Sequence, residues 1–121
     1  MKLAYARLAI LLIAAPLHSQ SLPPLPDSVE TLIGPVPIVL SKAPCGNPRE
    51  LGCYVMAYRI IFVHDSLPAV MAFKVLLHEV GHLRLSDARI NIADPDLEQR
   101  IVDLWATWAL HDLIESRKKK P

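Results

Sequence analysis

The sequence predicts an α+β protein in which a short sheet packs on a buried helix that is followed by a second helix. Eight of the 11 prolines lie between Pro16 and Pro48, so long helices are expected only in the second half of the chain. A run rich in β-branched and aromatic residues, YVMAYRIIFV, then precedes two segments that carry helix signals. This order of elements is the basis for the predicted class.

The composition limits the size and the partners of the protein. A chain of 121 residues with 52% hydrophobic and 21% charged residues is expected to fold as one domain rather than remain disordered. Lys and Arg number 13 and Asp and Glu 12, and a net charge of +1 argues against binding to nucleic acid or anionic membranes by charge alone. Only 4 glycines are present, which disfavours a Gly-rich phosphate loop.

Residues 1–19 have the pattern of a secretory signal peptide. Lys2 and Arg7 form a cationic start, and the apolar stretch that follows is short, contains Pro16 and ends in small polar residues. This stretch is too short for a comfortable membrane span, so no stable span is expected after cleavage. The prediction is a secreted or periplasmic protein; the alternative is an uncleaved anchor or a buried helix.

Residues 20–48 are predicted to form a Pro-rich irregular arm, and residues 49–121 the core. Leu32 to Leu40 could form a short edge strand, because its two prolines exclude it from a central position. The two cysteines, Cys45 and Cys53, are expected to form a disulfide after export, with turn residues between them. Free thiols or a metal-binding cysteine are the alternatives.

The core begins with a predicted strand from Tyr54 to Val63. A turn follows, in which Asp65 or Ser66 is expected to cap a helix that has Pro68 in its first turn and runs to about Leu85. This helix is apolar on nearly all sides and should therefore be buried.

The second helix is predicted from its cap to about Ser116. Asp94 is expected at the N-cap and Pro95 at the first helical position. A cationic run at 117–120 suits the negative end of the helix dipole. The predicted core face consists of Ile101, Leu104, Trp105, Trp108 and Leu113.

The motif that indicates chemistry is HEVGH in the first helix. His78 and His82 are four residues apart, so both imidazoles lie on one face and can bind one metal ion. Glu79 is adjacent and can act as the general base toward a metal-bound water. The alternative is a pair of core histidines that neighbouring residues satisfy, although an apolar helix has no packing reason to bury such groups.

With this motif the segment from Cys53 to about Leu110 resembles the zincin metallopeptidases. The resemblance implies a Zn²⁺ cofactor bound by His78 and His82, and peptide hydrolysis by a zinc-bound water that Glu79 activates. It also implies that a peptide or protein substrate pairs in extended form with a strand at the cleft, for which the segment 54–63 is the candidate.

The third zinc ligand is expected on the second helix, as in the small gluzincins. Their pattern of Glu, then Ala-Asp, then an aromatic-Ala pair is similar to Asp103 and Trp105-Ala106, which would put the Glu at position 99, where this chain has Gln. Glu98, one residue out of that register, is the favoured ligand because it can point inward. The alternatives are Asp87, Asp94, Asp96, Asp103 and His111, or Cys53 if the resemblance is to peptide deformylases.

The sequence therefore predicts an exported zinc peptidase with a minimal zincin-like core, which a partner chain could complete. The competing hypothesis is a non-catalytic exported binding module with a structural zinc or no metal. A chain of this size has little material for substrate subsites, which favours the second hypothesis.

Overall fold

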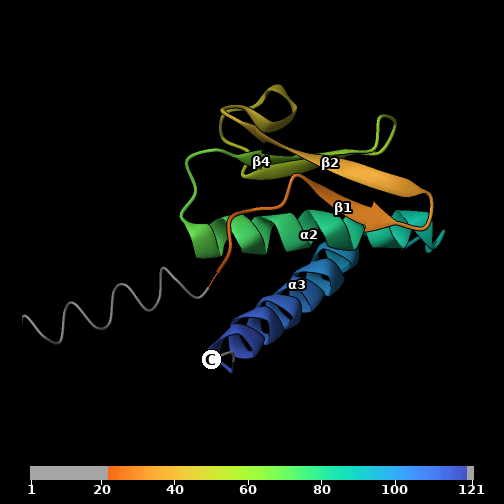
Figure 1. Cartoon of the computed structure of the whole chain (residues 1–121). Coiled ribbons are helices and arrows are strands. Elements are labelled where there is room, and N and C mark those ends of the chain that lie inside the picture. Colours follow the sequence, from red (N-terminus) through yellow and green to blue (C-terminus); the bar gives the residue numbers. More distant parts are fainter. Residues whose placement is uncertain (1–21, 120–121) are drawn as a thin grey trace, which may run out of the picture.

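The computed structural model describes residues 22–119, and the predicted signal segment lies outside them. A four-stranded mixed sheet lies on one side of a long helix, and a second helix lies on the other side (Figure 1). The predicted α+β class is confirmed. The elements are β1 (Ser28–Thr31), β2 (Gly34–Ser41), the 3-10 turn η1 (Pro44–Gly46), β3 (Gly52–Val55), β4 (Ile60–His64), α2 (Ala69–Asp87) and α3 (Pro95–Lys118).

The Pro-rich segment contributes two strands to the sheet: β2 lies where a short strand was predicted, whereas β1 replaces part of the predicted irregular arm. The strand order is β1-β2-β4-β3, which makes β2 an inner strand rather than an edge strand. Its prolines are tolerated because β2 pairs with β4 only from Ile38 onward. The backbone amide of Ile38 donates toward β1. Successive backbone amides of a strand alternate in direction, so the nitrogens of Pro35 and Pro37 face the side of β4, before the pairing with β4 begins.

The predicted strand from Tyr54 to Val63 is instead a hairpin. β3 and β4 pair antiparallel, with Val55 opposite Ile60, and the four residues between them form a turn. Arg59 adopts a left-handed backbone with a φ of 51°. The prediction failed because this turn contains no Gly, Pro or Asn. As a result β3, rather than β4, forms the edge of the sheet.

Helix α2 is the central layer, as its apolar sequence predicted. The sheet side chains Val36, Ile61 and Val63 pack against Leu76 and other buried residues of this helix. The predicted capping is wrong. Pro68 occupies the N-cap without a side-chain hydrogen bond, and Ser66 instead contacts the ring of His64.

Helix α3 packs against α2 and begins as predicted. The Asp94 carboxylate accepts hydrogen bonds from the backbone amides of Asp96 and Leu97. The predicted core face is wrong for Ile101, Leu104, Trp105 and Trp108, which are exposed. Leu113, its fifth member, packs against a buried cluster as predicted. The buried residues of α3 are Val102, Ala106 and Leu110, a stripe of smaller side chains at helical spacing.

The described residues 22–119 include no helix that is long and apolar enough to cross a membrane.

Candidate metal and catalytic site

The two histidines of HEVGH lie side by side on α2. Their ring centroids are 5.0 Å apart, and the rings are inclined at 70° to each other. Both Nε2 atoms face the same oxygen on α3: Gln99 Oε1 lies 2.8 Å from His78 Nε2 and 3.2 Å from His82 Nε2. The imidazole pair therefore converges on one point, as a shared metal ion requires.

The other nitrogen of each ring faces a carboxylate of α3. Glu98 Oε2 lies 2.6 Å from His82 Nδ1, and Asp103 Oδ1 lies 3.7 Å from His78 Nδ1. Glu98, the ligand favoured by the sequence, is thus brought to the site at the outer nitrogen of His82. Carboxylates in this position orient metal-binding histidines and fix the ring tautomer.

Gly81 allows α3 to approach the histidines closely. A Cβ atom at this position would lie 2.7 Å from Val102 Cγ1, well inside normal contact. This role of Gly81 was not predicted from the sequence. The signal that could have revealed it is the small residue inside HEVGH together with the small-residue stripe that begins at Val102, because small residues on facing helices permit close packing.

Glu79 is the one buried charged residue among those described. Its pKa lies above its usual range, chiefly because burial disfavours the carboxylate. The nearby imidazoles and a hydrogen bond with the Tyr54 backbone lower the pKa in part, and Glu50 raises it further. A carboxyl group with a raised pKa, next to two imidazoles in a cleft, is suited to proton transfer.

A cleft of about 970 Å³ opens beside Glu79 and the imidazole pair. Residues of the edge strand β3 and of α2 line it, and Glu98 and Gln99 contribute from α3. A second hollow of about 440 Å³ lies next to it, and both are lined by Glu50, Gly52, His78 and Glu79. The candidate catalytic groups thus have open space on two sides.

The close contact of β3 with α2 depends on Gly52. A Cβ at Gly52 would collide with Val75 and come within 3.4 Å of Glu79 Cγ. A glycine is therefore needed where this strand passes over the candidate catalytic carboxylate of Glu79.

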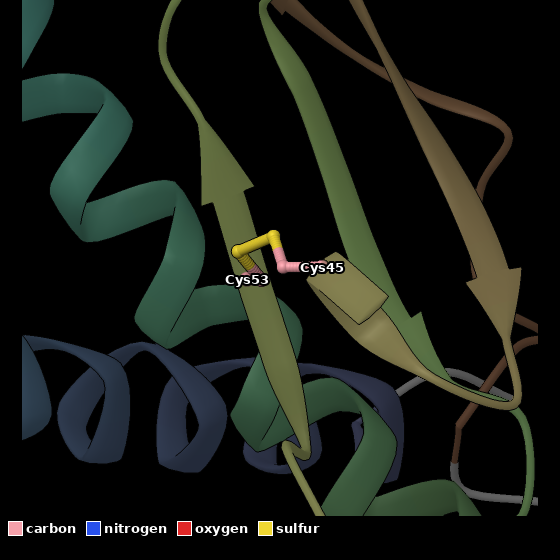
Figure 2. The surroundings of a disulfide bond; sticks show 2 residues. All are labelled: Cys45 and Cys53. Atoms are coloured by element: carbon pink, nitrogen blue, oxygen red, sulfur yellow. A yellow bond between two sulfur atoms is a disulfide. The ribbon is translucent and has the colours of Figure 1, made fainter. Parts of the chain in front are cut away.

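The predicted disulfide between Cys45 and Cys53 is confirmed and lies on the wall of the cleft. It joins η1 to β3, as Figure 2 shows. Both cysteines line the cleft, so the bond holds the loop 45–50 against the strand that borders the candidate site. With both thiols oxidised in this way, Cys53 has no thiolate to offer as a metal ligand.

The remaining ligand candidates have other contacts. Asp87 forms a two-fold contact with Arg59, at 2.6 and 3.2 Å, which lowers the pKa of its carboxyl group. Asp94 caps α3, and Asp96 is exposed in the first turn of that helix. The ring of His111 is 65% exposed, next to Asp112.

Within residues 22–119, no three side chains of His, Cys, Asp and Glu are arranged to hold a metal ion. The group facing the imidazole pair is instead the Gln99 carboxamide, whose oxygen can also coordinate a cation. Two imidazole nitrogens directed at one position, with carboxylates near the outer nitrogens of the rings, fit a zinc site if Gln99 Oε1 is counted as the third protein ligand. No protein-family model, curated protein or solved structure matches this chain.

Proposed function

We propose that the protein is a zinc-dependent peptidase of the zincin type. The observation that carries this proposal is the convergence of His78 and His82 through their Nε2 atoms, next to the buried Glu79 in an open cleft. Core histidines that merely satisfy packing have no need of a shared focus or of a cleft.

In this proposal His78 and His82 hold the metal, and Glu79 handles the proton. Bound zinc would supply a Lewis acid that polarises the scissile carbonyl and acidifies the attacking water. Glu79 accepts a proton from that water and delivers it to the leaving amine. Its raised pKa suits both steps, because a more basic carboxylate accepts the proton more readily and still releases it to an amine.

The proposed substrate is an extended polypeptide that lies along β3. This strand is at the edge of the sheet and borders the cleft, so a peptide can add to it as a further strand. The two adjoining hollows leave room for substrate residues on both sides of His78 and Glu79. This arrangement favours cleavage at internal peptide bonds over removal of a terminal residue.

Export to a secreted or periplasmic location is part of the proposal. The disulfide between Cys45 and Cys53 supports it, because such bonds persist in oxidising compartments. The cationic and apolar pattern of residues 1–19 supports it independently.

A non-catalytic binding module is the second candidate function. The observation in its favour is that none of the third-ligand candidates from the sequence directs a carboxylate to the imidazole Nε2 atoms. The two functions differ in whether the purified protein binds stoichiometric zinc through the imidazole pair.

The test is a zinc titration combined with a cleavage assay on an unfolded protein substrate. The wild-type protein should bind one zinc ion and produce internal fragments. His78→Ala should lose the metal, and Glu79→Gln should retain it while losing cleavage. His111→Ala is the matched control, because this exposed histidine of α3 lies outside the cleft lining. Absence of zinc after reconstitution, or full cleavage by Glu79→Gln, would refute the peptidase.

A further inference from the structure

We infer that the third protein ligand of the proposed zinc site is the neutral amide oxygen of Gln99, with Glu98 holding His82 from its outer side. This inference rests on the proposed function. Gln99 Oε1 is the oxygen within hydrogen-bonding distance of both Nε2 atoms, at 2.8 and 3.2 Å. It therefore occupies the focus of the imidazole pair.

The contact between Glu98 and His82 determines which ring nitrogen faces that focus as a ligand. Glu98 Oε2 lies 2.6 Å from His82 Nδ1, so this carboxylate occupies the outer nitrogen of the ring and leaves Nε2 directed at Gln99. His82 Nε2 lies 3.2 Å from Gln99 Oε1, and His78 Nε2 lies 2.8 Å from the same oxygen. A cation held by both Nε2 atoms and this oxygen would have the two imidazoles and the amide as its protein ligands.

His78 is placed in a similar way, but its outer nitrogen lies farther from the nearest carboxylate. Its Nδ1 lies 3.7 Å from Asp103 Oδ1, while its Nε2 faces Gln99. Each histidine therefore has an acid on the outer nitrogen and the shared amide on the inner one. Acids on the outer nitrogens are the usual partners of metal-binding histidines.

Helix geometry explains why Glu98 and Gln99 have different roles. Adjacent residues on an α-helix point about 100° apart, so the two side chains cannot reach the same point from one backbone. Gln99 and Asp103 are four residues apart and share a face, which directs both toward His78. Glu98 lies to one side of this face and reaches the outer nitrogen of His82.

The carboxamide of Gln99 also satisfies the site without a metal. In one orientation of the amide its NH₂ group can donate to both imidazole Nε2 atoms. In the flipped orientation its oxygen can bind a cation. Two imidazoles and an amide form an uncharged ligand set, comparable in charge to three histidines rather than to two histidines and a carboxylate. An uncharged set should bind Zn²⁺ more weakly than its Glu counterpart, because a carboxylate adds opposite charge at the metal.

The experiment measures Zn²⁺ affinity of the purified protein by competition with a chromophoric chelator, and the visible absorption of bound Co²⁺. Gln99→Ala should weaken zinc binding by about 100-fold or more, and Gln99→Glu should strengthen it by about tenfold or more. Glu98→Gln should weaken it by only about 10–100-fold and keep the Co²⁺ spectrum, as expected for an outer partner. Asp96→Asn is the matched control, an exposed acid in the same helical turn, and should bind zinc like the wild type.

The outcomes separate this inference from the proposed function. If Gln99→Ala binds zinc as tightly as the wild type while Glu98→Gln loses both the metal and the Co²⁺ spectrum, Glu98 is the ligand; the inference is then wrong and the peptidase stands. If the wild type binds no zinc, or His78→Ala binds it equally well, both are wrong. Far-UV circular dichroism of each variant verifies folding, and the gain expected for Gln99→Glu cannot arise from misfolding.

Discussion

Gly81→Ala tests whether the approach of α3 to α2 controls the site. The new methyl group would lie 2.7 Å from Val102 Cγ1 and 3.4 Å from Val102 Cβ and Cγ2. Carbon atoms pack at about 3.5–4.0 Å, so the helices must separate locally by about 1 Å. Val102 is 2% exposed and β-branched, so its side chain has little freedom to turn away. The backbone of α3 must move instead.

The expected effect on stability is small, and the effect on the site is large. Overpacking lowers the free energy of unfolding by about 1–3 kcal/mol, and replacing a helical Gly by Ala raises it by about 1 kcal/mol. The free energy of unfolding should therefore fall by about 0–2 kcal/mol. Gln99 is one turn before Val102, so the same shift would take its oxygen out of reach of the imidazoles. Zinc affinity should fall by about tenfold or more, because metal sites tolerate only small changes in distance.

Urea unfolding in the presence of a chelator measures the change in the free energy of unfolding. Competition with a chelator measures the change in zinc affinity. The matched variant is Val102→Ala, which removes the methyl group that Gly81→Ala would strike and alone costs about 2 kcal/mol. In the double variant the two changes should couple by about 1–3 kcal/mol, and zinc affinity should recover. Additive stabilities, within about 0.5 kcal/mol, together with unchanged zinc affinity in Gly81→Ala would refute the reasoning.

Two further predictions concern groups other than the proposed metal ligands. The Tyr54 hydroxyl is buried and has no hydrogen-bond partner among the described residues, so Tyr54→Phe should raise the free energy of unfolding by about 1 kcal/mol in urea; a loss of similar size would mean that the hydroxyl has a partner. The pKa of Asp87 is lowered mainly by its hydrogen bond with Arg59, so this pair stabilises the fold above the ordinary carboxyl pKa of 3.8 and is lost as pH falls below it. The melting temperature of wild type should exceed that of Asp87→Asn at pH 6, and the difference should close toward pH 2.5; a difference that is independent of pH would contradict the ion pair.

The elements with strong local signals were predicted well. The start of α3 is predictable because Asp94 favours the N-cap and Pro95 favours the first helical position. The burial of α2 follows from a sequence that is apolar on nearly every side. The disulfide follows from two cysteines separated by turn residues.

The errors arose where pairing and packing between elements override local preference. β2 lies inside the sheet although it contains Pro35 and Pro37, because its contact with β4 begins only after them. The hairpin turn before β4 lacks turn residues and is closed by Arg59 in a left-handed conformation. The tryptophans of α3 are exposed because the helix instead turns Val102, Ala106 and Leu110 to the buried side.

The sequence alone predicted the candidate catalytic and metal-binding groups. HEVGH on a helix brings His78, Glu79 and His82 together, because residues at short helical spacing share a face wherever the helix lies. The resemblance to the small gluzincins places the third ligand at position 99, where this chain has Gln, so the sequence favours the neighbouring Glu98.

Only the tertiary structure decided which oxygen faces the imidazole pair and which strand borders the cleft. Both depend on contacts between segments far apart in the chain: Gly81 against Val102, and Gly52 against Val75. Spacing within one helix does not determine how a second helix is rotated against it. This rotation places Glu98 on the outer nitrogen of His82 and Gln99 at the centre.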